Sequence, residues 1–156
     1  MRIIRGNLWN EYIHGYDAVC CTTNMCVKKD GSLVMGAGIA KQFADRFPIL
    51  PKTWGHATCK INNGYLKSGL IVTKYYEENN FIIDIVSFPT KYNWKDKSSL
   101  RLIEKSAEQL CMISYALNWS RILLPKPGCS NGGLKWKEVS QILSKILDNR
   151  FFIISR

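Results

Sequence analysis

The sequence has no apolar run long enough to cross a membrane. Its 156 residues include no stretch approaching the ~18 to 20 apolar residues that a transmembrane helix needs, and residues 1–6 hold no apolar core of signal-peptide length. We therefore expect a soluble, cytoplasmic protein that does not associate with membranes. Hydrophobic residues make up 46% and charged residues 22% of the chain, which excludes a disordered protein. The length predicts one domain spanning residues 1–156.

Metal-binding patterns are also missing. The two histidines, His14 and His56, share no ligand spacing. The six cysteines contain no CxxC pair, which argues against a structural zinc site. Cys20 and Cys21 lie in an apolar run, so we expect them to fill the core of a reduced protein. Cys129 follows a glycine and is the one candidate for a reactive thiol. We expect no metal and no cofactor.

Acidic residues are scarce, because 12 Asp and Glu stand against 22 Lys and Arg. The resulting formal charge of +10 attracts polyanions and favours a nucleic acid or a phosphate-rich ligand as a partner. A composition rich in Lys, Ile and Asn would give the same charge if the lysines merely solvated the surface. Charge alone does not decide between these two interpretations.

Six short apolar runs have the length and composition of β-strands. They are residues 3–4, 18–21, 70–73, 81–88, 122–124 and 151–154. Three stretches carry apolar residues at every third or fourth position, which predicts helices. The first covers residues 35–47 and ends at Pro48, the second covers residues 103–117 with Ser98 or Ser99 as its cap, and the third covers residues 136–146. This alternation predicts an α/β fold, a three-layer α/β/α sandwich with a central mixed sheet.

Two glycine-rich segments lie between a strand and a helix. The first is Met-Gly-Ala-Gly-Ile-Ala at residues 35–40, and the second is Pro-Gly-Cys-Ser-Asn-Gly-Gly at residues 127–133. Glycine lets the backbone approach an anion closely, and helix N-termini provide free N–H groups. Neither segment matches the dinucleotide fingerprint or the P-loop. Each alone could be a tight turn, but two at equivalent positions favour an anion-binding site.

These segments resemble those of the macrodomains, which are ADP-ribose-binding α/β/α modules. Gly6-Asn7-Leu8 after the first strand and Cys21-Thr22-Thr23-Asn24 at the end of the second strengthen the resemblance, and the order and spacing agree over the whole chain. Ser87-Phe88-Pro89-Thr90-Lys91-Tyr92-Asn93-Trp94-Lys95 is similar to the corresponding stretch of the DarG antitoxin-like branch. The resemblance implies an ADP-ribosyl hydrolase of the glycohydrolase type that removes ADP-ribose from modified DNA bases. Alternatives are a non-catalytic reader of ADP-ribose or a derivative, or an ADP-ribose 1''-phosphate phosphatase.

The resemblance also implies a set of site residues. Lys91 and Asn24 are the implied catalytic residues. An amine attacks carbon only in its neutral form, and we expect Phe88, Tyr92 and Trp94 to favour that form by desolvating Lys91, although they could also stack on a base. The implied ADP-ribose-binding residues are Asn7, Leu8, Asn24, Met35, Gly36, Ala37, Gly38, Ile39, Ala40, Thr90, Pro127, Gly128, Cys129, Ser130, Asn131, Gly132 and Gly133.

Two positions depart from the family pattern. Gly132 stands where a glutamate-specific relative has a catalytic aspartate, so the resemblance does not support activity on protein esters. Asn7 replaces the aspartate that contacts adenine, and its amide oxygen still accepts a hydrogen bond. Asn24 suits a ribose hydroxyl pair, but an Asn after a strand equally often bonds its own turn. We expect a monomer whose partner is ADP-ribose or an ADP-ribosylated substrate, with nucleic acid as a possible carrier.

Overall fold

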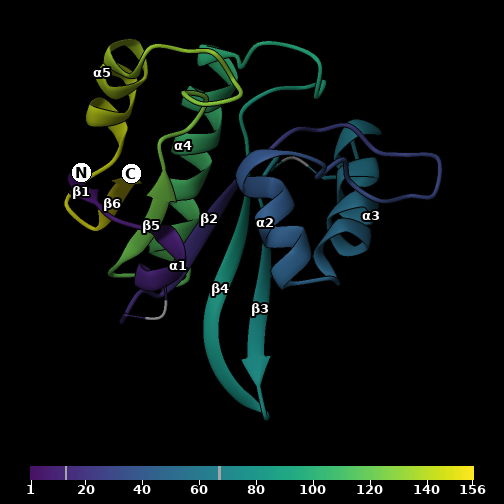
Figure 1. The fold of residues 1–156 in the computed structure, drawn as a ribbon, viewed down its shortest axis with the longest axis horizontal. Helices are drawn as coiled ribbons and strands as arrows, with labels where there is room; N and C mark the ends of the chain where they lie inside the picture. Colours follow the sequence, from purple (N-terminus) through teal and green to yellow (C-terminus); the bar gives the residue numbers. More distant parts are fainter. Residues whose placement is uncertain (13, 67) are drawn as a thin grey trace.

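The computed structural model describes residues 1–12, 14–66 and 68–156, and its centre is a six-stranded sheet (Figure 1). The strands are β1 (Arg2–Arg5), β2 (Ala18–Thr23), β3 (Ile71–Glu77), β4 (Asn80–Pro89), β5 (Ile122–Pro125) and β6 (Phe151–Ser155). Their order is β1-β6-β5-β2-β4-β3, and every neighbouring pair is parallel except the antiparallel β3–β4 pair. The predicted mixed sheet is therefore confirmed, with one strand at each predicted position.

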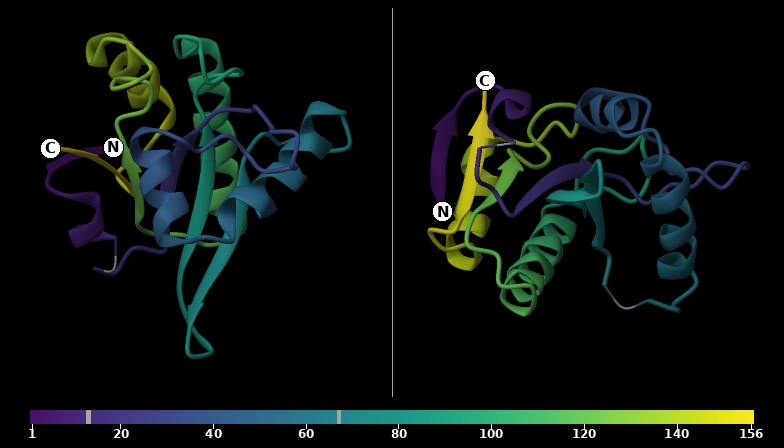
Figure 2. Two further views of the ribbon diagram at one scale, coloured as in Figure 1. Left: turned by 45° about the vertical axis from the view of Figure 1, so that its right-hand side comes forward. Right: turned by 90° about the horizontal axis from the view of Figure 1, so that it is seen from below.

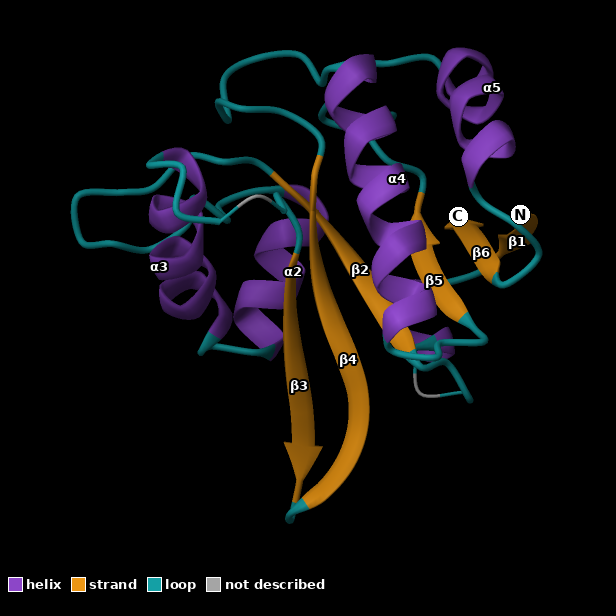
Figure 3. Ribbon diagram, turned by 180° about the vertical axis from the view of Figure 1, so that it is seen from behind, coloured by secondary structure: helices purple, strands orange, loops and turns teal. Residues whose placement is uncertain are grey.

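Helices cover both faces of the sheet. They are α1 (Leu8–Glu11), α2 (Gly38–Arg46), α3 (Leu50–Asn62), α4 (Leu100–Ala116) and α5 (Trp136–Ile146). Figures 2 and 3 show α4 and α5 on one side of the sheet and α2 and α3 on the other. This arrangement is the predicted three-layer sandwich. None of the described helices is long and apolar enough to cross a membrane.

The two layers of helices enclose two separate apolar cores. Successive side chains of a strand point to opposite faces, so β2 contributes Val19 and Cys21 to the core under α2 and α3, and Ala18 and Cys20 to the core under α4 and α5. Both cysteines are fully buried, and this burial raises the pKa of each thiol well above its usual range. They are core residues, as predicted.

The helix boundaries refine the prediction from the sequence. Ser99 caps α4, because its hydroxyl accepts from the N–H of Leu102 at 3.2 Å. The first helix begins at Gly38 rather than at the predicted residue 35. Met35 lies before the helix and packs in the core. α1 and α3 were not predicted. α3 buries Leu50, Trp54 and other residues on one side.

Candidate functional site

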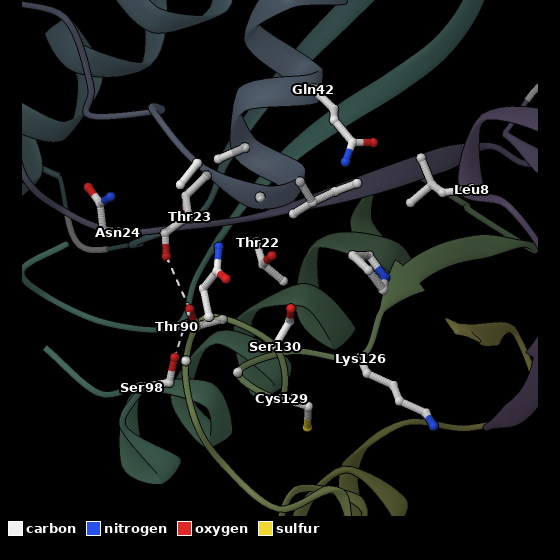
Figure 4. A pocket seen from close by; sticks show the side chains of 18 of the residues that line it. Leu8, Thr22, Thr23, Asn24, Gln42, Thr90, Ser98, Lys126, Cys129 and Ser130 are labelled. Carbon is white, nitrogen blue, oxygen red and sulfur yellow. Dashed lines mark hydrogen bonds between the residues drawn. The ribbon is translucent and has the colours of Figure 1, made fainter. Parts of the chain in front are cut away.

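A cavity of about 820 Å³ opens at the carboxyl ends of β2, β4 and β5 (Figure 4). Its volume lies within the range of roughly 300 to 1,000 Å³ that is typical of small-molecule sites. Loops that follow parallel strands meet at this edge of the sheet, as expected for a doubly wound α/β protein. Residues from β6, α1 and the start of α2 complete the lining.

One wall of the cavity is the glycine segment at the start of α2. Ala37 is the N-cap, and no side chain caps the helix there. Gly38 has φ +57°, a left-handed conformation that favours glycine. In the described part of the chain, the N–H groups of residues 36–40 donate to no protein acceptor. These groups therefore form a row of free donors at a helix N-terminus that lines the cavity.

The opposite wall is the glycine segment that follows β5. Hydrogen bonds from the N–H of Gly133 to Ser130 O (3.1 Å) and from the N–H of Leu134 to Gly128 O (2.9 Å) close this turn. The N–H groups of residues 128–132 donate to no acceptor among the described residues. A second row of free donors thus faces the cavity, and together the two rows suit an anion with oxygens on both sides.

The part of the cavity lining that the structure describes is basic and has no acidic side chain. Among the described residues that line it, Lys91, Lys126 and Arg156 are positively charged and none is Asp or Glu. Lys126 places its Nζ 5.0 Å from the centre of the Trp136 ring. No group of three His, Cys, Asp or Glu side chains with metal-binding geometry occurs in the described residues. This site can bind a polyanion through backbone donors and present a lysine to it.

Lys91 follows β4 and is partly buried in the lining. The preceding residue, Thr90, anchors it: the Thr90 N–H donates to Thr23 O (2.9 Å), and the Thr90 hydroxyl donates to the same oxygen (3.3 Å). The Ser98 hydroxyl donates to Thr90 Oγ1 at 3.4 Å, and the Ser98 N–H donates to Gly132 O at 2.9 Å. These bonds connect the end of β2, the Lys91 segment and the second glycine segment (Figure 4).

The three aromatic side chains expected to desolvate Lys91 differ in their burial. Phe88 is buried in the core under α4, while Tyr92 and Trp94 are 60% and 53% exposed. Phe88 is a residue of β4 and packs into the core, whereas Tyr92 and Trp94 lie in the turn after the strand and are exposed.

Cys129 does not have the environment of a reactive thiol. Its Sγ donates to Pro127 O at 3.5 Å, and burial raises the pKa of the thiol above its usual value despite the nearby Lys126. Since the thiolate is the nucleophilic form, a protonated Cys129 is a poor nucleophile at neutral pH.

Two asparagines of the site use their side chains locally. Asn24 donates from Nδ2 to Val34 O and accepts at Oδ1 from the N–H of Cys26, both at 2.9 Å. The alternative in which Asn24 bonds its own turn is therefore observed, although the amide keeps one N–H and one lone pair for a ligand. Asn7 caps α1, with Oδ1 accepting from the N–H of Trp9 at 2.9 Å.

Comparison with known proteins agrees with this geometry. A family model described as "Macro domain" matches residues 29–143. The chain belongs to the macrodomain family. Over 150 residues it is 31% identical to a DNA ADP-ribosyl glycohydrolase of Thermus aquaticus, covering 95% of this macrodomain and 38% of that protein. A DNA ADP-ribosyl glycohydrolase of Mycobacterium tuberculosis is 32% identical over 114 residues, which cover 70% of this chain and 30% of the relative. The chain thus spans about a third of the length of these relatives.

Solved structures have the same fold as this macrodomain. The macrodomain of Mycobacterium tuberculosis DarG superimposes with a TM-score of 0.74 at 28% identity, covering 99% of this chain and 97% of the other. The macrodomain of Thermus aquaticus DarG gives 0.72 at 28% identity with the same coverage. Thermosipho africanus DarTG in complex with ADP-ribose gives 0.77 at 22% identity, covering 99% of this chain and 41% of that one, and this likeness shows the fold alone.

Most of the predicted site residues line the cavity of this macrodomain. They are Asn7, Leu8, Asn24, Gly36, Ala37, Gly38, Ile39, Ala40, Thr90, Lys91, Gly128, Cys129, Ser130, Asn131 and Gly132. Three predicted residues lie outside the lining. Met35 and Pro127, the first residues of the two glycine segments, are buried, and Gly133 lies on the exposed side of the turn.

Several lining residues were missed by the sequence analysis. Trp9 and Gln42 share a hydrogen bond of 2.7 Å from the indole N–H to Oε1. Gln42 lies one helical turn after Gly38, so helical spacing from the glycine segment could have identified it. The last residues, 154–156, carry no local signal and reach the cavity only because β6 lies beside β5.

Proposed function

We propose that this macrodomain binds ADP-ribose and removes it from modified nucleobases of DNA, with Lys91 as the attacking residue. The observation that carries the proposal is one cavity that joins two rows of free backbone N–H groups to a lysine. The names of the relatives support the substrate, because both are DNA ADP-ribosyl glycohydrolases. The formal charge of +10 also favours a polyanionic substrate.

The orientation of ADP-ribose follows from the position of Lys91. The pyrophosphate lies between residues 36–40 and 128–132, where N–H groups replace its hydration shell. The distal ribose lies toward Asn24 and Thr90 (Figure 4), because Lys91 follows Thr90 and must reach the anomeric carbon. The adenine then occupies the other end, near Leu8 and Gln42. The amide oxygen of Asn7 keeps a lone pair for its amino group.

The chemistry assigned to Lys91 is nucleophilic catalysis. Its neutral amine forms a bond to the anomeric carbon as the bond to the base breaks, and the base leaves with the electron pair and takes up a proton. The ribosylamine on Lys91 opens to an imine. Water then hydrolyses the imine, which restores the amine and releases ADP-ribose. The described residues of the cavity lining include no Asp or Glu side chain, so we assign no carboxylate side chain to the hydrolysis step.

We also propose that residues 1–156 form a single macrodomain that works as a cytoplasmic monomer. Its role would be antitoxin-like, since it reverses an ADP-ribosylation that another enzyme makes. The continuous sheet and its two cores support a single unit.

The proposed activity is tested by incubating the protein with ADP-ribosylated DNA and, separately, with ADP-ribosylated protein. We expect free ADP-ribose from the DNA only. Release from modified protein alone would overturn the assignment of the substrate.

A non-catalytic reader of ADP-ribose is the second candidate. It is favoured by one observation, the lack of Asp, Glu and His among the described residues of the lining, which leaves the activation of water to Lys91 or to the substrate. Tight binding of ADP-ribose without release from any modified substrate would establish this alternative.

A further inference from the structure

We propose that Trp94 and Tyr92 form a stacking platform for the unmodified nucleotides that flank the ADP-ribosylated base. The platform lies on the rim loop, defined as residues 91–97 between β4 and α4. This inference rests on the proposed function, because it assigns the part of the substrate that extends beyond ADP-ribose. The platform would hold the carrier strand, whereas the cavity holds ADP-ribose.

The first observation is the exposure of the two rings. Trp94 is 53% exposed, and in the described part of the chain it is the only strongly exposed large apolar side chain that lines the cavity. Tyr92, two residues earlier, is 60% exposed. Neither ring belongs to an apolar core of the sandwich. Core packing therefore does not account for the exposed Trp94 in the cavity lining or for Tyr92 two residues earlier, and an external aromatic ligand would cover both rings.

The second observation is that the rim loop has a defined backbone. The N–H of Lys95 donates to Asn93 Oδ1, and the N–H of Asp96 donates to Asn93 O, both at 3.1 Å. The carbonyl oxygen of Tyr92 accepts from the N–H of Met25 at 3.2 Å, which ties the loop to the segment after β2. These bonds fix the backbone that carries the two rings. Stacking on the rings therefore costs less conformational entropy than stacking on rings of a mobile loop would.

The third observation is the charge around the rings. The rim loop contains Lys91, Lys95 and Lys97 but only one acidic residue, Asp96. Lys95 Nζ lies 5.4 Å from the centre of the Trp94 ring. Exposed aromatic faces interleaved with lysines bind nucleic acids whose bases are unpaired, because rings stack on bases while ammonium groups contact phosphates. An acidic peptide would use the lysines but would offer no base to stack on the exposed rings.

The position of the platform fits the route of such a strand. Lys91 and Trp94 both line the cavity, and the other rim residues from Tyr92 to Lys97 are exposed. A base attached to the anomeric carbon at Lys91 therefore leaves the cavity past Trp94. The neighbouring nucleotides are then the first groups that the exposed rings meet.

The test compares two substrates and uses Trp94→Ala. One substrate is a DNA oligonucleotide with one ADP-ribosylated base and several unmodified nucleotides on each side, and the other is the ADP-ribosylated nucleoside alone. Stacking on an aromatic residue contributes enough affinity that its loss raises the KM of the oligonucleotide by about 5- to 100-fold. We expect the ratio of the two KM values to rise by that factor in Trp94→Ala and to recover in Trp94→Phe. Tyr92→Ala should give a smaller rise.

Tyr76→Ala is the matched control. Tyr76 is also 53% exposed and lies two residues after Lys74 in the sequence, but it lies at the opposite end of the β3–β4 hairpin from Lys91 (Figure 1). It should leave the KM ratio unchanged. Equal effects of Trp94→Ala on both substrates, or no effect on either, would overturn the platform.

Failure of the proposed function gives a different result. If the parent protein releases ADP-ribose from neither substrate, the enzymatic proposal fails, and the platform is then tested by fluorescence anisotropy with the unmodified oligonucleotide. Weaker binding to Trp94→Ala than to Tyr76→Ala would support the platform on its own. Equal binding to both variants would overturn it.

Discussion

Asn131 and Gly38 meet across the cavity, where Asn131 Nδ2 lies 2.7 Å from the point at which a Cβ on Gly38 would stand. One residue belongs to the loop after β5 and the other begins α2, so this contact brings the two glycine segments together. The close approach depends on the missing side chain of Gly38 and on its left-handed backbone. The spacing of the two segments around the proposed pyrophosphate site therefore depends on the contact between the Asn131 side chain and Gly38.

Gly38→Glu should abolish binding of ADP-ribose while the protein stays folded. The new side chain displaces the Asn131 amide and places a carboxylate beside the free N–H groups that would hold the pyrophosphate. The left-handed conformation adds strain of about 1 to 2 kcal/mol. Isothermal titration calorimetry measures the affinity and thermal denaturation checks the fold. Gly38→Ala separates strain from charge, and it should lose much less affinity than Gly38→Glu. Unchanged affinity in a folded Gly38→Glu protein would show that the anion binds elsewhere.

Gly132→Ala and Gly132→Asp should both lower the free energy of unfolding. A Cβ on Gly132 would overlap Ser98 Oγ and would lie 2.6 Å from Gly128 O, so the turn must shift. Overpacking of this kind costs about 1 to 3 kcal/mol, measurable by urea denaturation. Gly36→Ala is the control, because a Cβ at Gly36 meets nothing within 4 Å. By the same contact we expect an acidic residue at position 132 to be poorly accommodated, because Ser98 occupies the space.

The fold was predictable from the sequence wherever the signal is local. Each strand is an apolar run, and α4 and α5 have regular apolar stripes. α3 was missed because its buried face includes Gly55 and Thr58, which break the apolar pattern. Gly55 is required by a distant contact, since a Cβ there would collide with Gly31 O and the N of Leu33. A contact between segments so far apart in the sequence has no local signature.

The site, like the fold, was predictable from the sequence where its signal is local. The two glycine segments indicate places where the backbone can approach a ligand closely, and most of their residues do line one cavity. The partners of side chains were not predictable. Asn24 bonds the carbonyl of Val34, ten residues away, and the Trp9 indole bonds Gln42 on another helix. The exposure of Tyr92 and Trp94 likewise depends on a turn whose shape the sequence does not reveal.

Thr90→Val should lower kcat more than it changes the affinity for ADP-ribose. Valine preserves the shape of Thr90 but removes the hydroxyl that donates to Thr23 O and accepts from Ser98. Thr90 is a positioning residue for Lys91 in this proposal, and loss of such bonds is worth about 0.5 to 1.5 kcal/mol each. Thr90→Ser keeps the hydroxyl and should restore most of kcat. A purely structural role would lower the melting temperature of Thr90→Val without changing kcat at a temperature where the variant is folded.

Cys129 should resist alkylation at neutral pH. Burial raises the pKa of its thiol, so the reactive thiolate becomes abundant only at a pH above the usual range for cysteine. Iodoacetamide labelling across a pH series, read residue by residue with mass spectrometry, should show Cys129 reacting with a higher apparent pKa than a cysteine peptide. Fast labelling of Cys129 at neutral pH would reopen the possibility that it is a nucleophile.

Lys91→Ala should lose release of ADP-ribose from modified DNA and retain affinity for ADP-ribose within a few fold. The affinity comes mainly from the backbone donors of the two glycine segments, which this substitution leaves in place. Treatment with borohydride during turnover should reduce the imine on Lys91 and trap a covalent adduct in the parent protein, detectable as added mass on the peptide that contains residue 91. No adduct should form in Lys91→Ala.

Lys91→Arg decides between a nucleophile and a phosphate contact. Arginine keeps the positive charge, contacts phosphate well and cannot form the imine. If Lys91 is the nucleophile, Lys91→Arg binds ADP-ribose and is as inactive as Lys91→Ala. If Lys91 only contacts phosphate, Lys91→Arg keeps both binding and release, whereas Lys91→Ala loses both together. Full activity in Lys91→Ala would remove Lys91 from the mechanism altogether, and the described lining would then offer only Lys126, Cys129 and Arg156 as ionisable side chains.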